Sequence, residues 1–182
     1  MSWEEVSILI NQLASDIKEF FKIEGEKIDV ISPMLRTGGI TGGLLSIKLK
    51  VVPILPIQFK YFYKPTIIKQ IISVPEILVE IPKNVNILLC EGNTNSGSIA
   101  IKASKVIKEK YPFAKIYLAT LTKVYGGPEK LEGIEKIFCG RITNESFKAS
   151  AEQVNNLNLR KGVTIFPWED VSDELADINN SL

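Results

Sequence analysis

The spacing of apolar residues along the chain predicts alternating helices and strands. Between residues 6 and 21, apolar residues recur at intervals of three and four, which is the helical period. Ser2 and Glu5 form the pattern of a capping box just before them, so this first helix should begin near Trp3. Further helices are expected at residues 44–49 and 98–111. Strand patterns cover residues 27–32, 51–59, 84–90, 115–123, 134–139 and 163–167.

The order of these elements favours an α/β fold. Residues 84–90 end in a continuous apolar run, which suits a strand that is covered on both faces. Residues 51–59 contain two prolines, so this segment is expected at a sheet edge or as irregular extended chain. Strands and helices that alternate with short connections predict a doubly wound, mostly parallel sheet. The length of 182 residues fits one domain over residues 1–182.

Two segments fall outside this alternation. Residues 60–83 combine aromatic residues with lysines and prolines, and we expect a hairpin or a mobile flap there. Aromatic residues interleaved with cations also occur in grooves for single-stranded nucleic acid. The net charge of +1 gives such a function little support. Residues 169–182 contain five acidic residues and no basic one, which predicts a solvated helix or a frayed end.

Composition narrows the chemistry and the location. The chain has no histidine, which excludes Ser-His and Cys-His nucleophilic catalysis and zinc sites with histidine ligands. Cys90 and Cys139 lack the spacing of a metal site and are expected to pack in the interior. No apolar run reaches the ~20 residues of a membrane span, and the acidic start of the chain is unlike a signal peptide. We therefore expect a cytoplasmic protein that does not contact a membrane.

The strongest candidate for chemistry is the polar segment that follows the apolar run. It begins with Glu91 and leads into the helix predicted from Ser98. A helix N-terminus offers unpaired backbone N–H groups and a partial positive charge. Gly97 lets the backbone approach an anion, and Thr94 and Ser96 add hydroxyl donors, so the segment suits a phosphate monoester. Asparagine and serine are also ordinary helix caps, and simple capping remains the alternative.

The run ILLCEGNTNSGS in this segment resembles the phosphoribosyl pyrophosphate (PRPP) motif of the type I phosphoribosyltransferases. Other segments are similar, in the same order, to the bacterial xanthine-guanine and hypoxanthine phosphoribosyltransferases of that family. They are SWEEVSILINQLASDI, VISPMLRTGGITGGLLSIKL, YPFAKIYLATLTKVYGG and VTIFPWED. The resemblance implies the fold of that family, with a small hood and a mobile flap at about residues 60–83.

The resemblance also implies roles for individual residues. The catalytic residues would be Glu91 and Asn95, and Glu91 would also be a ligand of Mg²⁺. The 5-phosphate of PRPP would bind to Asn93, Thr94, Ser96, Gly97 and Ser98. The pyrophosphate would bind to Arg36, Thr37, Gly38 and Gly39, and the base to Lys123 and Trp168. The family often forms dimers or tetramers, so a homo-oligomer is expected.

Two departures from the family pattern leave two functions open. Gly92 stands where the family has a second acidic residue, and Asn95 stands where an aspartate usually accepts a proton from the purine. One function is transfer of ribose 5-phosphate from PRPP to a purine-type nucleobase, with release of pyrophosphate. The other is a catalytically impaired module that binds nucleotides or PRPP and acts as a sensor or an assembly subunit. For an enzyme, the double substitution of Gly92→Asp and Asn95→Asp is expected to raise turnover.

Overall fold

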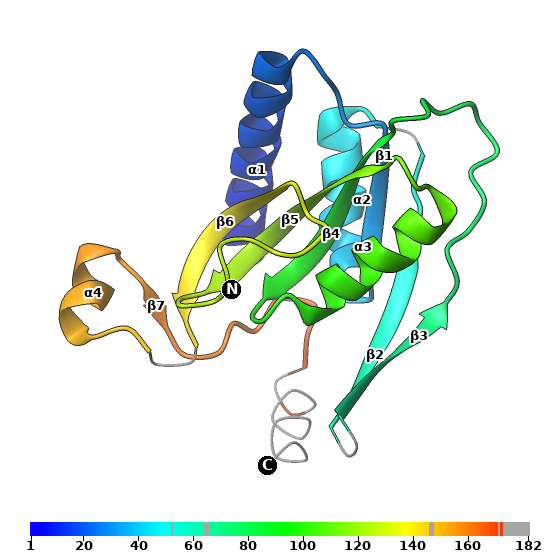
Figure 1. The fold of residues 1–182 in the computed structure, drawn as a ribbon. Coiled ribbons are helices and arrows are strands. Elements are labelled where there is room, and N and C mark those ends of the chain that lie inside the picture. The colour runs from blue at the N-terminus through cyan, green and yellow to red at the C-terminus, as the bar shows by residue number, and fades with distance from the viewer. Residues whose placement is uncertain (52, 64–65, 146–147, 171, 173–182) are drawn as a thin grey trace.

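The computed structural model describes residues 1–51, 53–63, 66–145, 148–170 and 172. Within this part the helices are α1 (Trp3–Glu24), α2 (Thr37–Leu49), α3 (Ser98–Lys110) and α4 (Ala151–Asn156) (Figure 1). The strands are β1 (Val30–Leu35), β2 (Ile57–Tyr63), β3 (Thr66–Ile72), β4 (Asn86–Thr94), β5 (Lys115–Val124), β6 (Lys136–Asn144) and β7 (Arg160–Lys161).

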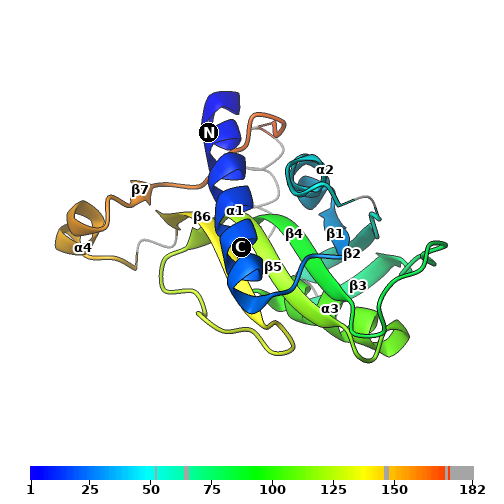
Figure 2. The same ribbon diagram turned by 90° about the horizontal axis from the view of Figure 1, so that it is seen from above.

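These strands form one sheet in the order β3-β2-β1-β4-β5-β6-β7. Every neighbouring pair is parallel except β2 and β3, which are antiparallel. Helices α1 and α2 cover one face of the sheet, and α3 covers the other (Figure 2). Each face has its own buried apolar cluster. The predicted doubly wound, mostly parallel α/β fold is therefore confirmed.

The first helix forms as its sequence predicts. The Ser2 side chain accepts a hydrogen bond from the Glu5 N–H, and the Glu5 carboxylate accepts one from the Ser2 N–H, which completes the capping box. Gly25, in a left-handed conformation, ends the helix. In the described part of the chain, neither α1 nor another helix is long and apolar enough to cross a membrane.

The glycine-rich run after β1 is helical, so the helix expected only at residues 44–49 begins seven residues earlier, at Thr37. Strand β1 continues to Leu35, and α2 begins two residues later. The physical reason is close packing of helix on sheet. A Cβ atom on Gly38 would overlap the carbonyl oxygen of Cys90, and one on Gly42 would lie 2.9 Å from the Cβ of Pro33. Two of the four glycines therefore let α2 lie directly against β1 and β4, where larger residues would not fit.

The segment at residues 51–59 is irregular in part, as one of the two expectations for it allowed. Residues 53–56, with both prolines, lie outside the named strands, whereas residues 57–59 begin β2, which lies between β1 and β3 and is therefore not a sheet edge. Residues 163–167 form no strand, because the N–H groups of Thr164 and Phe166 donate to the carboxylates of Glu145 and Glu169. Helix α4 was not predicted, although Ser150 and Gln153 give it a second capping box.

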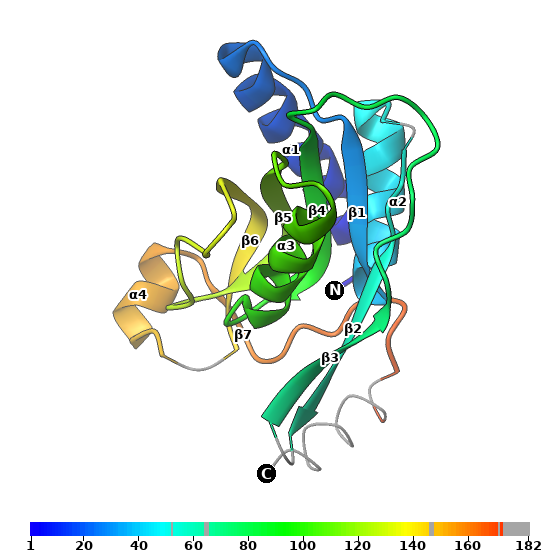
Figure 3. The ribbon, with the colours of Figure 1, turned by 45° about the vertical axis from the view of Figure 1, so that its right-hand side comes forward.

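Residues 60–83 contain the hairpin that the sequence allowed. Strands β2 and β3 pair antiparallel, and their hairpin projects beyond the carboxyl ends of the neighbouring parallel strands (Figure 3). After β3 the chain returns to β4 without regular secondary structure. The mobility expected of this segment stays a prediction.

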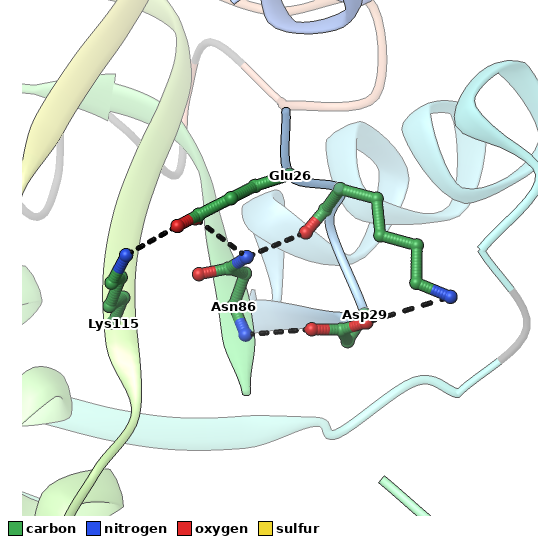
Figure 4. Close-up of polar contacts among 5 residues, drawn as sticks. Glu26, Asp29, Asn86 and Lys115 are labelled. Carbon is green, nitrogen blue, oxygen red and sulfur yellow. Dashed lines mark hydrogen bonds and ion pairs between the residues drawn. The ribbon is translucent and has the colours of Figure 1, made fainter. Parts of the chain in front are cut away.

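A polar network joins three strands at the opposite, amino edge of the sheet. The Asn86 side chain donates to Glu26 and to the carbonyl of Lys27, and its backbone N–H donates to Asp29 (Figure 4). Lys115 forms an ion pair with Glu26 at 2.6 Å, and its hydrogen bond lowers the pKa of Glu26. The network thus ties the starts of β1, β4 and β5 together.

The contact between α2 and β4 leads to a test at the glycines of α2. Gly38→Ala should lower the free energy of unfolding by about 1–3 kcal/mol, because the added methyl group has no space. Gly43 is the control, since nothing lies within 4 Å of its Cβ position. There, alanine should raise stability by about 0.5–1 kcal/mol. Urea unfolding of both variants measures the difference, and equal stability of the two would contradict this packing.

Candidate functional site

The connectivity of the sheet places a crevice between the carboxyl ends of β1 and β4. The chain leaves β1 through α2 and enters β2 on one side, while β4 lies on the other side of β1. The strand order therefore reverses between β1 and β4. Open α/β sheets bind their ligands at the carboxyl ends of the strands on either side of such a reversal. The fold thus marks this crevice as the candidate site before any side chain is considered.

Two adjoining cavities occupy the crevice. One has a volume of about 250 Å³ and the other about 230 Å³, and both are lined by Glu91, Asn93 and Ile99. The larger cavity is also bounded by the turn from β1 into α2 and by a segment near the C-terminus of the described chain. The residues from these two segments are Arg36, Thr37, Gly38, Val163, Thr164, Phe166 and Glu169. The smaller cavity is completed by Asn95, Ser96, Gly97 and Ser98.

The smaller cavity lies at the N-terminus of α3. Strand β4 extends to Thr94, so the turn into α3 is shorter than the sequence indicated and contains Asn95, Ser96 and Gly97. Gly97 has a φ of 72°, a left-handed conformation that favours glycine, and a Cβ there would also strike Leu131. The hydroxyls of Ser96 and Ser98 lie 2.8 Å apart. The Ser98 N–H donates to the Ser96 hydroxyl at 3.4 Å. The N-terminus of α3 therefore lies at a cavity lined by two hydroxyl groups, a setting that suits an anion.

Glu91 is the carboxylate shared by both cavities. Its Oε2 accepts a hydrogen bond of 2.6 Å from the hydroxyl of Thr94. Burial of the carboxyl group raises the pKa of Glu91 to about 7, and the hydrogen bond from Thr94 acts in the opposite direction. Thr94 itself is buried and supports Glu91, although the sequence assigned it to phosphate binding.

Asn93 is held in place from two sides. Its side-chain oxygen accepts from the hydroxyl of Thr122, and its side-chain nitrogen donates to Glu145 at 3.0 Å. The other oxygen of Glu145 accepts from the N–H of Thr164. This chain of bonds connects the end of β4 to the C-terminal wall of the larger cavity. Glu145 is a supporting residue that the sequence did not reveal, because its partners come from distant segments.

The space beside Gly92 is closed. A Cβ on Gly92 would overlap the Cγ2 of Thr37 and lie 3.2 Å from the ring of Phe166. A methyl group and an aromatic ring thus stand where the second acidic side chain of the PRPP motif would begin. The structure therefore gives no support to the expectation that Gly92→Asp raises turnover, because the aspartate would have to displace Thr37.

The residues that the resemblance assigns to pyrophosphate binding lie where β1 leads into α2 and in the first turn of that helix. Arg36 is exposed and lines the larger cavity with Thr37 and Gly38. Gly39 lies in the first turn of α2, and its N–H donates to the carbonyl of Arg36. Gly39 does not appear among the described residues that line the two cavities.

The resemblance assigns two residues, Lys123 and Trp168, to binding of the base. Among the described residues, neither of them lines either cavity. Lys123 lies near the end of β5, paired in register with Thr94. Trp168 stacks on Phe166 at a ring distance of 4.8 Å and also contacts Trp3 at 5.5 Å. Phe166 therefore forms the aromatic wall of the larger cavity, and Trp168 supports it from behind. The segment VTIFPWED carried the sequence signal for this wall, but the resemblance assigned the base to Trp168 and not to Phe166.

Comparisons with known proteins identify the fold. No family model matches the chain, and no curated protein sequence matches it. The purine phosphoribosyltransferase of Pyrococcus horikoshii OT3 matches with a TM-score of 0.65 and 20% identity, over 93% of this chain and 92% of that chain. A hypoxanthine-guanine phosphoribosyltransferase of Bacillus anthracis, with a HEPES molecule in its active site, matches with a TM-score of 0.62 and 21% identity. That match covers 80% of this chain and 82% of the other chain. A Neisseria gonorrhoeae protein with bound ppGpp matches with a TM-score of 0.59 and 20% identity, over 86% of this chain and 93% of the other chain.

The chain therefore has the fold of the type I phosphoribosyltransferases, as its resemblance to their motifs implied. At this level of identity, the function has to be argued from the site itself.

The closed space at Gly92 gives the first test of this site. Gly92→Asp should lower the free energy of unfolding by about 1–3 kcal/mol, because the side chain has to displace Thr37 and Phe166. Combination with Thr37→Gly, which removes the obstructing methyl group, should recover part of that loss. Thermal unfolding of the two variants and of Thr37→Gly alone measures the recovery. A fully stable Gly92→Asp protein would show that the space is open.

The raised pKa of Glu91 gives a second test. The folded protein holds this proton up to a pH of about 7, whereas the unfolded chain releases it near 4.5, the ordinary pKa of a glutamate side chain. The proton therefore stabilises the folded state at low pH, and this contribution is lost as the pH rises towards 7. The stability of wild type relative to Glu91→Gln should fall by about 2 kcal/mol between pH 5 and pH 8.

Urea unfolding at both pH values measures this change. Glu80→Gln removes one exposed carboxylate and is the matched control for the change in net charge. If the difference in unfolding free energy between wild type and Glu91→Gln is the same at both pH values, the Glu91 carboxyl group is well solvated.

Proposed function

We propose that the crevice between β1 and β4 binds the ribose 5-phosphate portion of PRPP and that the protein transfers it to a purine-type nucleobase with release of pyrophosphate. The observation that supports this most directly is the smaller cavity, where the N-terminus of α3 and the hydroxyls of Ser96 and Ser98 meet. Helix N-termini of this kind bind phosphate through backbone N–H groups. The fold supports the same reading, because phosphoribosyltransferases share it.

The arrangement of the two cavities fits a ligand with phosphate groups at both ends. The 5-phosphate would bind at residues 95–98, and the ribose would lie over Glu91, which both cavities share. The pyrophosphate would face Arg36 and Thr37 in the larger cavity. In the transfer, the bond from the anomeric carbon to pyrophosphate breaks, and its electron pair leaves with the pyrophosphate. A ring nitrogen of the base then supplies the electron pair of the new bond, and the proton that the base loses passes to the departing pyrophosphate or to solvent.

The base would lie against Phe166, and Trp168, stacked on the ring of Phe166, would support this wall without touching the base. Lys123 lines neither cavity, so the contact with the base that the resemblance implies for it stays a prediction. Asn95 is exposed at the turn into α3, and an amide cannot take up a proton. Since a positioned general base contributes typically about 10²–10⁴ in rate, slow turnover is expected unless the base is already nucleophilic. The hairpin of β2 and β3 projects past the crevice and would reduce the access of water during transfer.

Magnesium would be held in this site by one protein carboxylate, that of Glu91. Mg²⁺ in nucleotide sites commonly binds to one or two carboxylates and to phosphate oxygens of the substrate, so a single carboxylate fits. The carboxyl groups of Glu145 and Glu169 already accept hydrogen bonds from neighbouring groups of the chain. No cluster of three or more metal-ligating side chains occurs among the described residues. When bound, the ion would neutralise charge on the departing pyrophosphate.

The second candidate function is a nucleotide- or PRPP-binding module that does not catalyse transfer. The closed space beside Gly92 favours it, because Glu91 is then left without the second carboxylate that the PRPP motif offers to the ribose hydroxyls. A charge-assisted hydrogen bond is worth about 1.5–3 kcal/mol, so this loss lowers affinity for ribose by about one to two powers of ten. The phosphate end of the site does not depend on that carboxylate. For either function, we infer small-molecule ligands, a homo-oligomer and the cytoplasm, where the free thiols of Cys90 and Cys139 stay reduced.

The phosphate site can be tested with one substitution at the start of α3. Ser98→Asp places a carboxylate where the phosphate would bind, and a negative charge at a helix N-terminus favours the fold. We expect the variant to stay folded and its affinity for guanosine 5′-monophosphate and PRPP to fall at least about 100-fold by calorimetry. Ser98→Ala, which loses only a hydroxyl, should change affinity less than about tenfold.

Pyrophosphate release from PRPP with guanine, hypoxanthine or xanthine distinguishes the two functions. Release with any of these bases establishes the enzyme. Binding of PRPP or nucleotide without pyrophosphate release in the presence of any of the three bases would support the binding module. A wild-type protein that binds neither nucleotide nor PRPP at about 1 mM ligand would contradict both.

A further inference from the structure

The aromatic wall of the larger cavity belongs to a segment without regular secondary structure. Residues 163–169 contribute Val163, Thr164, Phe166 and Glu169 to the lining of that cavity, yet they form no helix or strand. The bond from the Phe166 N–H to the Glu169 carboxylate lies within the segment itself. The position of the wall relative to the sheet therefore depends on contacts that other elements make with it.

Such contacts come from β6 and from the start of α1. Directly after β6, the carboxylate of Glu145 accepts a hydrogen bond from the N–H of Thr164. At the start of α1, the amino group of Met1 donates to the carbonyl of Ile165 at 2.7 Å (Figure 1). The ring of Trp3, in the first turn of α1, lies 5.5 Å from the ring of Trp168. The first turn of α1 thus lies directly beside the wall.

Three aromatic rings run in series from α1 to the cavity. Trp3 contacts Trp168, Trp168 stacks on Phe166 with an angle of 4° between the ring planes, and Phe166 lines the cavity. Trp168 packs against the apolar cluster on the α1 face of the sheet. Its indole N–H is buried and has no hydrogen-bond partner in the described structure. The position of this indole is therefore set by its ring contacts and its packing.

Trp3 lies outside the face by which α1 packs on the sheet. The buried residues of α1 are Val6, Leu9, Ile10, Leu13, Ala14, Ile17 and Phe21. The side chain of Trp3 is 55% exposed, and its printed ring contact is the one with Trp168. Substitution of Trp3 should therefore leave the helix and the sheet in place, so that an effect on the wall can be separated from an effect on folding.

We propose that Trp3 is a positioning residue for the base, because it holds the ring of Phe166 in place through Trp168. This inference rests on the proposed function, since it takes the larger cavity as the site of the base. Trp3 lines neither cavity, so it acts only through the wall. A ring that is already held in position loses less conformational freedom when a ligand binds against it.

The same arrangement predicts that the two ends of the site respond differently to Trp3. The phosphate end, at residues 95–98, contains no member of the aromatic series. Loss of the Trp3 ring should therefore weaken the binding of a purine base and leave the binding of a sugar phosphate unchanged.

Guanosine 5′-monophosphate and ribose 5-phosphate separate these two effects, because both carry the sugar phosphate and the first also carries the base. Trp3→Ala should lower the affinity for guanosine 5′-monophosphate by about fivefold to tenfold in calorimetry, because one aromatic contact is lost. Its affinity for ribose 5-phosphate should change by less than about twofold. Trp3→Phe keeps a ring against Trp168 and should bind guanosine 5′-monophosphate within about threefold of the wild type.

The fluorescence of Trp168 gives a second measurement on the same protein. The chain has two tryptophans, so Trp3→Phe leaves Trp168 as the only one. Guanosine 5′-monophosphate should change the emission of Trp168 in this variant, because its base would lie against the ring on which Trp168 stacks. Ribose 5-phosphate should leave the emission unchanged.

A matched control is Phe113→Ala. Phe113 is an aromatic residue of similar exposure, 57%, in the turn before β5 at the opposite edge of the sheet. This variant should leave both affinities unchanged, and urea unfolding shows that each variant is folded.

Four results would overturn the proposal. Trp3→Ala could lower the two affinities equally, Trp3→Phe could lose as much affinity as Trp3→Ala, or Phe113→Ala could have the same effect as Trp3→Ala. Guanosine 5′-monophosphate could also bind without changing the emission of Trp168. A wild-type protein that binds neither ligand gives a different result, which contradicts the proposed function and removes this inference with it.

Discussion

The close approach of α2 to β4 at Gly38 is the constraint on which the rest of this structure depends. A helix can start beside the carbonyl of Cys90 only because Gly38 has no side chain. That contact brings the turn at Arg36 next to Glu91 and gives the crevice two walls from segments more than fifty residues apart. The same approach brings the methyl group of Thr37 over Gly92. One packing contact thus both creates the site and removes room for a second carboxylate in it.

The site that results has two ends of different character. The end at α3 consists of backbone N–H groups and hydroxyls, which bind phosphate without needing a particular charged side chain. The end at α2 and Phe166 has Glu91, which both cavities share, one arginine, Glu169 bonded to the backbone of Phe166, and an aromatic wall. The departures from the PRPP motif lie at both ends, at Gly92 and at Asn95. The hydroxyls and the helix N-terminus at the α3 end do not depend on the space beside Gly92, so the two ends can differ in what they bind, since fold and activity are separable.

The two edges of the sheet carry separate features. The carboxyl edge holds the crevice, the hairpin and the C-terminal wall with Phe166. The amino edge is fixed by the network of Glu26, Asn86 and Lys115, beside a groove whose lining includes Lys18, Lys22 and Lys50.

The sequence by itself determined the α/β class, the first helix with its capping box, the buried strand that begins near Asn86, and the polar turn with hydroxyl side chains that leads into α3. These features depend on local periodicity and on residues close together in the chain. Only the tertiary structure decided that the glycine-rich run is a helix, that Gly92 is covered by Thr37, and that Phe166, with Trp168 behind it, lines the cavity. Each of these depends on a contact between distant segments, and the distance of closest approach between such segments is not encoded in any local pattern.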